Sequence, residues 1–181
     1  NGGGIASGDF NNDGLQDLVF TGNMVKNRLY INQGNLSFKD VTKSSHIAEQ
    51  EGWCTGVTTA DVNCDGWLDI YICRAGYPFE KLTRNMLYIN NGDLTFTDKA
   101  AEYGLDDKAH STQAAFFDYD KDNDLDLLLI NHSDVQYSRG SLEVLPIRKI
   151  KKPETTNKLY RNDGGHFHDV TQEAGITSNV L

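Results

Sequence analysis

The 181-residue sequence predicts an all-β protein built from four-stranded antiparallel sheets. Three observations predict it. An acidic loop pattern occurs three times between short β-type runs, a second shared motif follows each loop, and a Gly-containing turn follows each second motif. The loops begin at Asp9, Asp61 and Asp118, so the repeat period is 52 and then 57 residues.

The first two strands of each unit flank the acidic loop. Small or apolar residues precede the loop, as at 5–8 and 114–117. Runs rich in β-forming and apolar residues follow it, at 18–21, 70–73 and 127–130. Each loop is therefore expected to connect two strands of one hairpin.

The third and fourth strands of each unit come from a second shared segment. The pattern N-x-L-Y-x-N or its close variant occupies residues 27–32, 85–90 and 157–162. A turn with glycine follows each copy, and then a short strand with one phenylalanine: Phe38, Phe96 or Phe167. We expect these phenylalanines, and the tyrosine of each motif, to pack between neighbouring sheets.

Four strands in a unit of 50 to 60 residues are typical of a β-propeller blade. The sequence therefore predicts three blades, in residues 1–50, 51–109 and 110–181, with a long insertion at 132–156 in the third.

The acidic loops follow the pattern D-x-[ND]-x-D-[GN]-x-x-D, which places oxygen side chains at positions 1, 3, 5 and 9. Calcium takes six to eight oxygen ligands at about 2.3–2.6 Å, and a backbone carbonyl at position 7 adds another. The sequence therefore predicts three Ca²⁺ sites. The expected ligands are Asp9, Asn11, Asp13, Leu15 and Asp17 in the first loop, Asp61, Asn63, Asp65, Trp67 and Asp69 in the second, and Asp118, Asp120, Asp122, Asp124 and Asp126 in the third.

The loop geometry separates this pattern from its alternatives. Position 6 needs positive φ, which suits Gly14 and Gly66, and Asn123 is the next most tolerant residue. An EF-hand would need Glu at position 12 and two flanking helices, and position 12 holds an apolar residue in all three copies. A metal-free turn is common for one such loop, but three copies in register favour calcium.

The residues at 8–14 and 160–165, with the loops and the N-x-L-Y-x-N strands, resemble FG-GAP/VCBS repeats, and most closely those of the ASPIC/UnbV-type group. These repeats occur in integrin α-chains and in many secreted bacterial proteins. The resemblance implies a calcium-binding propeller of seven or a similar number of blades. Three blades cannot close such a ring, so the chain is expected to be a portion of a longer protein. Asn123 departs from the usual glycine, which implies slight strain in the third loop.

The formal net charge of −9 is concentrated in the loops, which hold eleven acidic residues. Three bound Ca²⁺ ions would bring it to −3. This acidity argues against a nucleic-acid partner, and no apolar run is long enough for a transmembrane helix. Because calcium sites of modest affinity are typical of extracellular modules, we expect an extracellular or cell-surface location, with association to a bacterial outer membrane as one form of it.

The three cysteines, Cys54, Cys64 and Cys73, show no C-x-x-C spacing, and no zinc site is assembled. Cys54 and Cys73 are expected to be small buried residues, and a disulfide among the three stays open.

The rim opposite the calcium loops is the expected ligand-binding face, because the connections between second and third strands vary in length there. The insertion at 132–156 is long for a structureless loop, and loops of that length are usually functional or disordered. A decorative insertion that packs on its own blade is the alternative. The candidate ligand-binding residues are Tyr77, Phe79, Tyr137, Arg139, Arg148 and Lys149.

No catalytic motif such as G-x-S-x-G or H-E-x-x-H is present. The leading interpretation is a non-catalytic, calcium-stabilised propeller that binds a protein or glycan, or mediates adhesion, with the remaining blades of the propeller as further partners. The alternatives are the propeller portion of an extracellular lyase or glycosidase, and a structural spacer.

Overall fold

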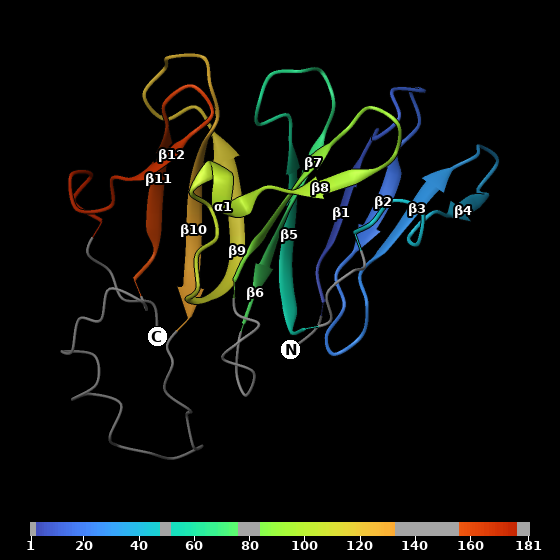
Figure 1. The fold of residues 1–181 in the computed structure, drawn as a ribbon, viewed down its shortest axis with the longest axis horizontal. Coiled ribbons are helices and arrows are strands. Elements are labelled where there is room, and N and C mark those ends of the chain that lie inside the picture. Colours follow the sequence, from blue (N-terminus) through green and yellow to red (C-terminus); the bar gives the residue numbers. More distant parts are fainter. Residues whose placement is uncertain (1–2, 48–51, 76–83, 133–155, 177–181) are drawn as a thin grey trace.

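The computed structural model describes residues 3–47, 52–75, 84–132 and 156–176. Its strands form three separate four-stranded antiparallel sheets, each following the chain order of its strands (Figure 1). The prediction of an all-β fold with three four-stranded blades is confirmed.

Each sheet is a meander of four strands. Sheet 1 contains β1 (Ile5–Gly8), β2 (Asp17–Phe20), β3 (Arg28–Asn32) and β4 (Phe38–Asp40); sheet 2 contains β5 (Cys54–Ala60), β6 (Asp69–Arg74), β7 (Met86–Asn90) and β8 (Phe96–Asp98); sheet 3 contains β9 (His110–Phe117), β10 (Asp126–His132), β11 (Lys158–Asn162) and β12 (Phe167–Asp169). The acidic loops connect the first and second strands of each sheet and lie at the same end of the molecule (Figure 1).

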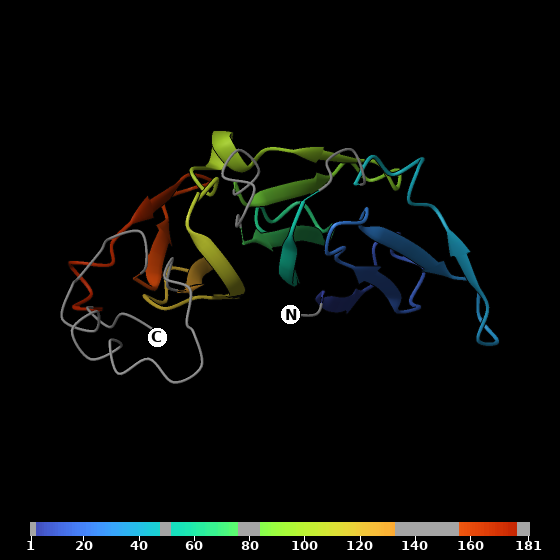
Figure 2. The same cartoon turned by 90° about the horizontal axis from the view of Figure 1, so that it is seen from below.

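The sheets are arranged as an open arc with the first strands toward its inner side (Figure 2). Strand β5 packs against both β1 and β9, so the first strands of neighbouring sheets are in contact. The fourth strands lie toward the outer side of the arc (Figure 2).

Sheet 2 is buried on both faces because side chains alternate along its strands. Ile70 and Ile72 belong to a core cluster shared with sheet 1, whereas Tyr71 and Cys73 belong to a cluster shared with sheet 3. All six residues of β6 are buried in consequence. The two apolar layers between the sheets are therefore the core of the protein.

The repeated aromatic residues enter these layers in sheets 2 and 3. Phe96 packs edge-on against Phe10 at 6.1 Å between ring centroids, and Phe167 packs against Phe116 at 6.2 Å. Phe38, the equivalent residue of sheet 1, is 40% exposed. The expectation that all three would pack between sheets is wrong for Phe38, because no sheet covers that face of sheet 1 within the described residues.

The linker between sheets 2 and 3 contains one helical turn that the sequence analysis did not predict. This turn, α1 (Ala100–Tyr103), ends at Gly104, whose φ of 78° is left-handed and whose N–H bonds to the carbonyl of Ala100.

The first asparagine of each N-x-L-Y-x-N motif has a structural role that explains its recurrence. Its Oδ1 accepts a hydrogen bond from a backbone N–H near the end of the second strand. The bonds run from Gly22 to Asn27 at 2.9 Å, from Arg74 to Asn85 at 2.8 Å, and from Asn131 to Asn157 at 3.1 Å. Because Asn27 and Asn85 are buried, these bonds satisfy polar groups that water does not reach.

All three cysteines are free. Cys54 and Cys73 are buried, as expected, and burial raises the pKa of both thiols. They pack as small apolar residues.

Candidate metal centres

Each acidic loop is held against the Gly-containing turn of its own sheet by one asparagine, the last residue of the N-x-L-Y-x-N motif. The Nδ2 groups of Asn32, Asn90 and Asn162 donate to the carbonyls of Gln16, Leu68 and Leu125 in the loops. Their Oδ1 atoms accept from the N–H groups of Gly34, Gly92 and Gly165 in the turns. This role was not predicted from the sequence, although the recurrence of the asparagine at the end of the same motif in every repeat was a usable signal.

The last aspartate of each loop is buried and held in one orientation. Asp69 is typical: its Oδ2 accepts from the N–H of Val62 at 3.0 Å and its Oδ1 from the N–H of Asn90 at 2.9 Å. Asp17 and Asp126 accept equivalent pairs of bonds. An ionised carboxylate has about four lone-pair sites, so each of these groups keeps capacity for a cation.

The first aspartate of each loop accepts two backbone N–H groups from the turn. In the first loop, Asp9 accepts from Asp13 at 3.1 Å and from Gly14 at 2.7 Å. Asp61 accepts the corresponding pair from Asp65 and Gly66. Asp118 accepts from Asn123 and from Lys121, which stands one position earlier in its loop than the donor in the other two. The loop therefore wraps its backbone around the carboxylate.

This wrapping depends on left-handed backbone at position 6, as the sequence predicts. The φ angles are 86° at Gly14, 89° at Gly66 and 77° at Asn123. Position 4 is also left-handed, with φ of 57° at both Asn12 and Cys64 and 68° at Lys121. The second requirement was not predicted, because Cys and Lys carry no preference for that conformation.

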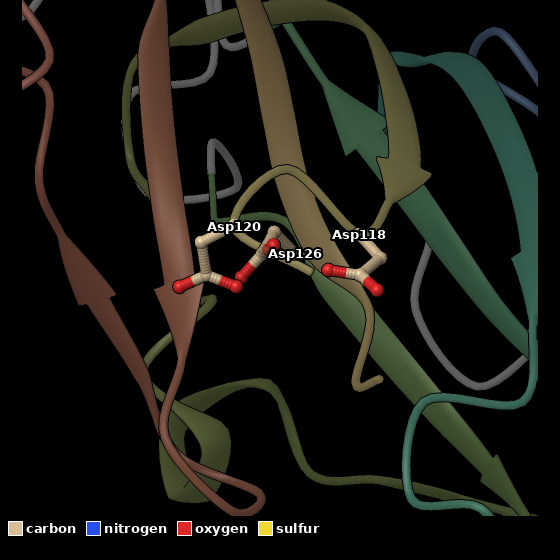
Figure 3. Close-up of side chains that lie close together, drawn as sticks. All are labelled: Asp118, Asp120 and Asp126. Carbon is tan, nitrogen blue, oxygen red and sulfur yellow. The ribbon is translucent and has the colours of Figure 1, made fainter. Parts of the chain in front are cut away.

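Only the third loop brings three carboxylates to one point among the described residues. Ligand oxygens of Asp118, Asp120 and Asp126 all lie within 4.8 Å of one another (Figure 3). The first two loops have an amide at position 3 in place of a carboxylate. There, Asn11 Nδ2 donates to Asp13 at 2.9 Å and Asn63 Nδ2 donates to Asp65 at 2.8 Å.

The electrostatics of the loops favour a counter-cation. Burial raises the pKa of Asp69 to about 7, the charges of Asp65 and Asp61 act in the same direction, and bonds from backbone N–H groups oppose them. The pKa values of Asp17, Asp120 and Asp124 are also raised, with burial as the largest cause. No ion pair found among the described residues includes a loop carboxylate.

The donor set fits Ca²⁺. Every predicted ligand offers oxygen, which suits a hard cation, and neither His nor Cys belongs to the set. In addition, Asp124 Oδ1 is buried without a hydrogen-bond partner in the described part of the chain. A buried carboxylate oxygen without a partner is costly, and a cation at this loop would offset that cost.

The candidate ligand-binding residues Tyr77, Phe79, Tyr137, Arg139, Arg148 and Lys149 lie outside the described residues.

Two histidine pairs are described. His110 and His132 are cross-strand partners in β9 and β10. The rings of His166 and His168 lie 4.8 Å apart, with His168 Nε2 3.6 Å from Asp163 and His166 Nδ1 3.2 Å from the carbonyl of Glu102.

No helix among the described residues has the length and apolar character needed to cross a membrane.

No curated protein sequence matches the chain. Among solved structures, it is similar to that of an Agrocybe aegerita lectin, described as specifically recognising non-reducing terminal N-acetylglucosamine, with a TM-score of 0.49 and 17% identity. The match covers 90% of this chain and 36% of the lectin, so the chain spans just over a third of that protein's length.

The FG-GAP-like repeat matches residues 9–72 and 80–129, which together are more than half of the chain. The matched ranges include all three acidic loops, and also Asn32 and Asn90, the asparagines that hold the loops of the first two sheets against their turns. This chain belongs to the FG-GAP-like repeat family.

Proposed function

We propose that this chain is a calcium-stabilised, non-catalytic binding module that forms three blades of a β-propeller. The observation that carries the proposal is the aspartate at the end of each loop: Asp17, Asp69 or Asp126. Each is buried next to other carboxylates, and no positively charged side chain pairs with these carboxylates among the described residues. Three such sites in register at one end of the sheets support a common metal role.

Each loop residue has a defined part in this proposal. In the second loop, Asp61, Asn63, Asp65 and Asp69 would offer side-chain oxygens to Ca²⁺, and Trp67 would offer its backbone carbonyl. The ion would neutralise carboxylates that otherwise repel one another, and it would tie the start of β6 to the end of β5. The same arrangement holds for the first and third loops.

The binding part of the proposal rests on the repeat family and on the position of the loops. The acidic loops and the Gly-containing turns bonded to them occupy one rim, so the opposite rim is the proposed site for a protein or glycan ligand. The remaining blades of the propeller are proposed to cover the two outer faces of the arc. An extracellular or cell-surface setting follows from calcium sites of modest affinity, because calcium outside the cell would keep them filled.

Thermal melting in EDTA and across a millimolar calcium titration tests the metal sites. Calcium should raise the melting temperature, since each site adds RT ln(1 + [Ca²⁺]/Kd) to the free energy of unfolding. Asp65→Ala should lose a large part of that rise, because it removes one ligand of the second loop.

Asp93→Ala is the matched control. Asp93 accepts a bond from the N–H of Thr95 at 2.9 Å, just as Asp65 accepts from the N–H of Trp67 at 2.9 Å, but it lies outside the loops. Both variants lose one charge and two local hydrogen bonds, one from a backbone N–H and one from a side chain, so only a metal role separates them. Equal calcium-dependent shifts in the two variants and the parent would remove the basis for the second site.

A further inference from the structure

The face of sheet 1 that points away from sheet 2, here called the outer face of sheet 1, carries exposed apolar residues. Ile5, Phe20 and Phe38 on this face are 60%, 37% and 40% exposed. Ile5 and Phe20 are cross-strand partners, so they form one continuous patch. Large exposed apolar groups that lie together mark a contact surface.

The residues at the equivalent positions of sheets 2 and 3 indicate the role of this face. The equivalent residues of sheet 2 are buried against sheet 1, and those of sheet 3 are buried against sheet 2. They are Val57, Ile72 and Phe96 in sheet 2, and Ala114, Leu129 and Phe167 in sheet 3. The same three positions therefore form a sheet-to-sheet interface twice within this chain.

Next to this patch, on the rim opposite the loops, is a hollow of about 770 Å³. Lys26, Arg28, Lys43 and His46 line it with Asp40, and Arg28 Nη1 lies 3.3 Å from Asp40 Oδ2. Three permanent positive charges against one negative charge make it basic within an acidic protein.

In sheets 2 and 3 the corresponding corner is filled by the linker from the preceding sheet. Ile47, on the linker after sheet 1, is fully buried in the cluster that includes Met86 and Tyr88. Leu105, on the linker after sheet 2, is fully buried in the cluster that includes Tyr160. The linker after sheet 1 thus crosses to sheet 2, where the N–H of Phe96 donates to the carbonyl of Ser45 at 3.0 Å, and the linker after sheet 2 joins the cluster that sheets 2 and 3 share.

The linker after sheet 2 also supplies a carboxylate. Asp107 accepts a hydrogen bond from Tyr160 Oη at 2.7 Å and pairs with Lys158. Tyr160 and Lys158 are the repeat equivalents of Tyr30 and Arg28 in sheet 1. Arg28 and Tyr30 therefore present the same donor pair on the outer face of sheet 1.

The linkers share a recognisable feature. A left-handed residue precedes the buried one, with φ of 63° at His46, before Ile47, and 78° at Gly104, before Leu105. Gly175, with φ of 69°, precedes Ile176 in the same way after sheet 3, and Ile176 is only partly buried. Sheet 3 also leaves Tyr119 36% exposed, whereas its equivalents Phe10 and Val62 are buried.

We propose that the outer face of sheet 1 docks another blade of this repeat type together with the linker that leaves that blade. The apolar linker residue fills the hollow, and a carboxylate two positions later bonds to Arg28 and Tyr30. This inference rests on the proposed propeller and adds the chemistry of the docked blade.

A second copy of this chain is the probe, because its sheet 3 and its Gly175–Ile176 linker form such a unit. Sedimentation velocity in saturating calcium should show concentration-dependent self-association of the 181-residue chain. Ser178 stands two positions after Ile176, where Asp107 stands after Leu105. Ser178→Asp should strengthen the self-association by about tenfold, because it supplies the charged acceptor.

Two variants of the docking face serve as controls. Arg28→Met places the residue that sheet 2 has at the equivalent position, Met86, and so suits the fold; it should abolish the gain from Ser178→Asp. Phe20→Asp should abolish self-association in both backgrounds. Calcium-dependent melting of the same samples reports the metal sites separately, since none of these residues belongs to a loop.

The inference is overturned if the parent and the Ser178→Asp chain both stay monomeric, or if the gain persists with Arg28→Met. A calcium-dependent rise in melting temperature alongside either result would leave the proposed metal sites standing.

Discussion

At the scale of single residues, Asn90, the asparagine that ends the second N-x-L-Y-x-N motif, connects three segments of the structure. Asn90 is buried and donates from Nδ2 to the carbonyls of Phe10 at 2.9 Å and Leu68 at 3.2 Å. Its Oδ1 accepts from Gly92 at 3.0 Å, and its own N–H donates to Asp69. One side chain thus joins the loop and the turn of sheet 2 to the loop of sheet 1.

Asn90→Ala should lower the free energy of unfolding by about 2–4 kcal/mol, because it leaves buried backbone groups without partners. Urea denaturation in saturating calcium measures the effect. The neighbouring Asn91→Ala is the control, because Asn91 is exposed and bonds through its side chain to Thr95 and Thr97. A similar loss of unfolding free energy in both variants would contradict the role of Asn90 in joining the loops to the turn.

At the scale of the element, the acidic loop is a turn rich in Asp and Asn. The position of its carboxylates depends on the backbone conformation of the turn. The N–H groups of residues 13 and 14 reach Asp9 only because the chain turns left-handed between positions 3 and 7. Glycine adopts that conformation without strain, whereas asparagine adopts it at some cost.

Asn123→Gly should therefore raise the free energy of unfolding by about 0.5–1 kcal/mol. Asn123→Ala should lower it by about 1 kcal/mol or more, because alanine has no tolerance for a φ of 77°. Chemical denaturation of the two variants in calcium gives both signs. An increase with alanine would show that the left-handed conformation is not required in solution.

At the scale of the whole molecule, eleven loop carboxylates at one rim dominate the charge balance of −9. Asp69 has a folded-state pKa of about 7, well above the value of about 3.9 of an unfolded aspartate. A raised carboxyl pKa stabilises the folded state below the unfolded pKa, and this contribution is lost as the pH rises through the folded pKa. Asp17, Asp120 and Asp124 act with the same sign.

In EDTA, the free energy of unfolding should therefore decrease as the pH rises from about 4 to 7. Saturating calcium should remove or reverse this trend, because the ion takes the place of the protons. Urea denaturation at a series of pH values, with and without calcium, checks the prediction. A stability in EDTA that increases steadily to pH 7 would contradict it.

Much of the candidate site was predictable because its residues are close in sequence. Nine consecutive residues place Asp61, Asn63, Asp65 and Asp69 around one turn, so a pattern read along the chain finds them. The hydrogen bond from Asn90 Nδ2 to the carbonyl of Phe10 spans 80 positions and joins two sheets, and no local pattern encodes such a contact. The left-handed backbone at Cys64 and Lys121 could not be predicted from the sequence either, because the loop imposes this conformation on residues that do not prefer it.

The sequence by itself determined the order of strands, the hairpins and the position of each loop, because side-chain alternation and turn residues act between near neighbours. Only the tertiary structure decided which face of each sheet is covered. Phe38, Phe96 and Phe167 follow the same local pattern, yet Phe38 is 40% exposed and the other two are buried. Burial depends on the sheet that lies opposite, and that sheet is supplied by another part of the chain.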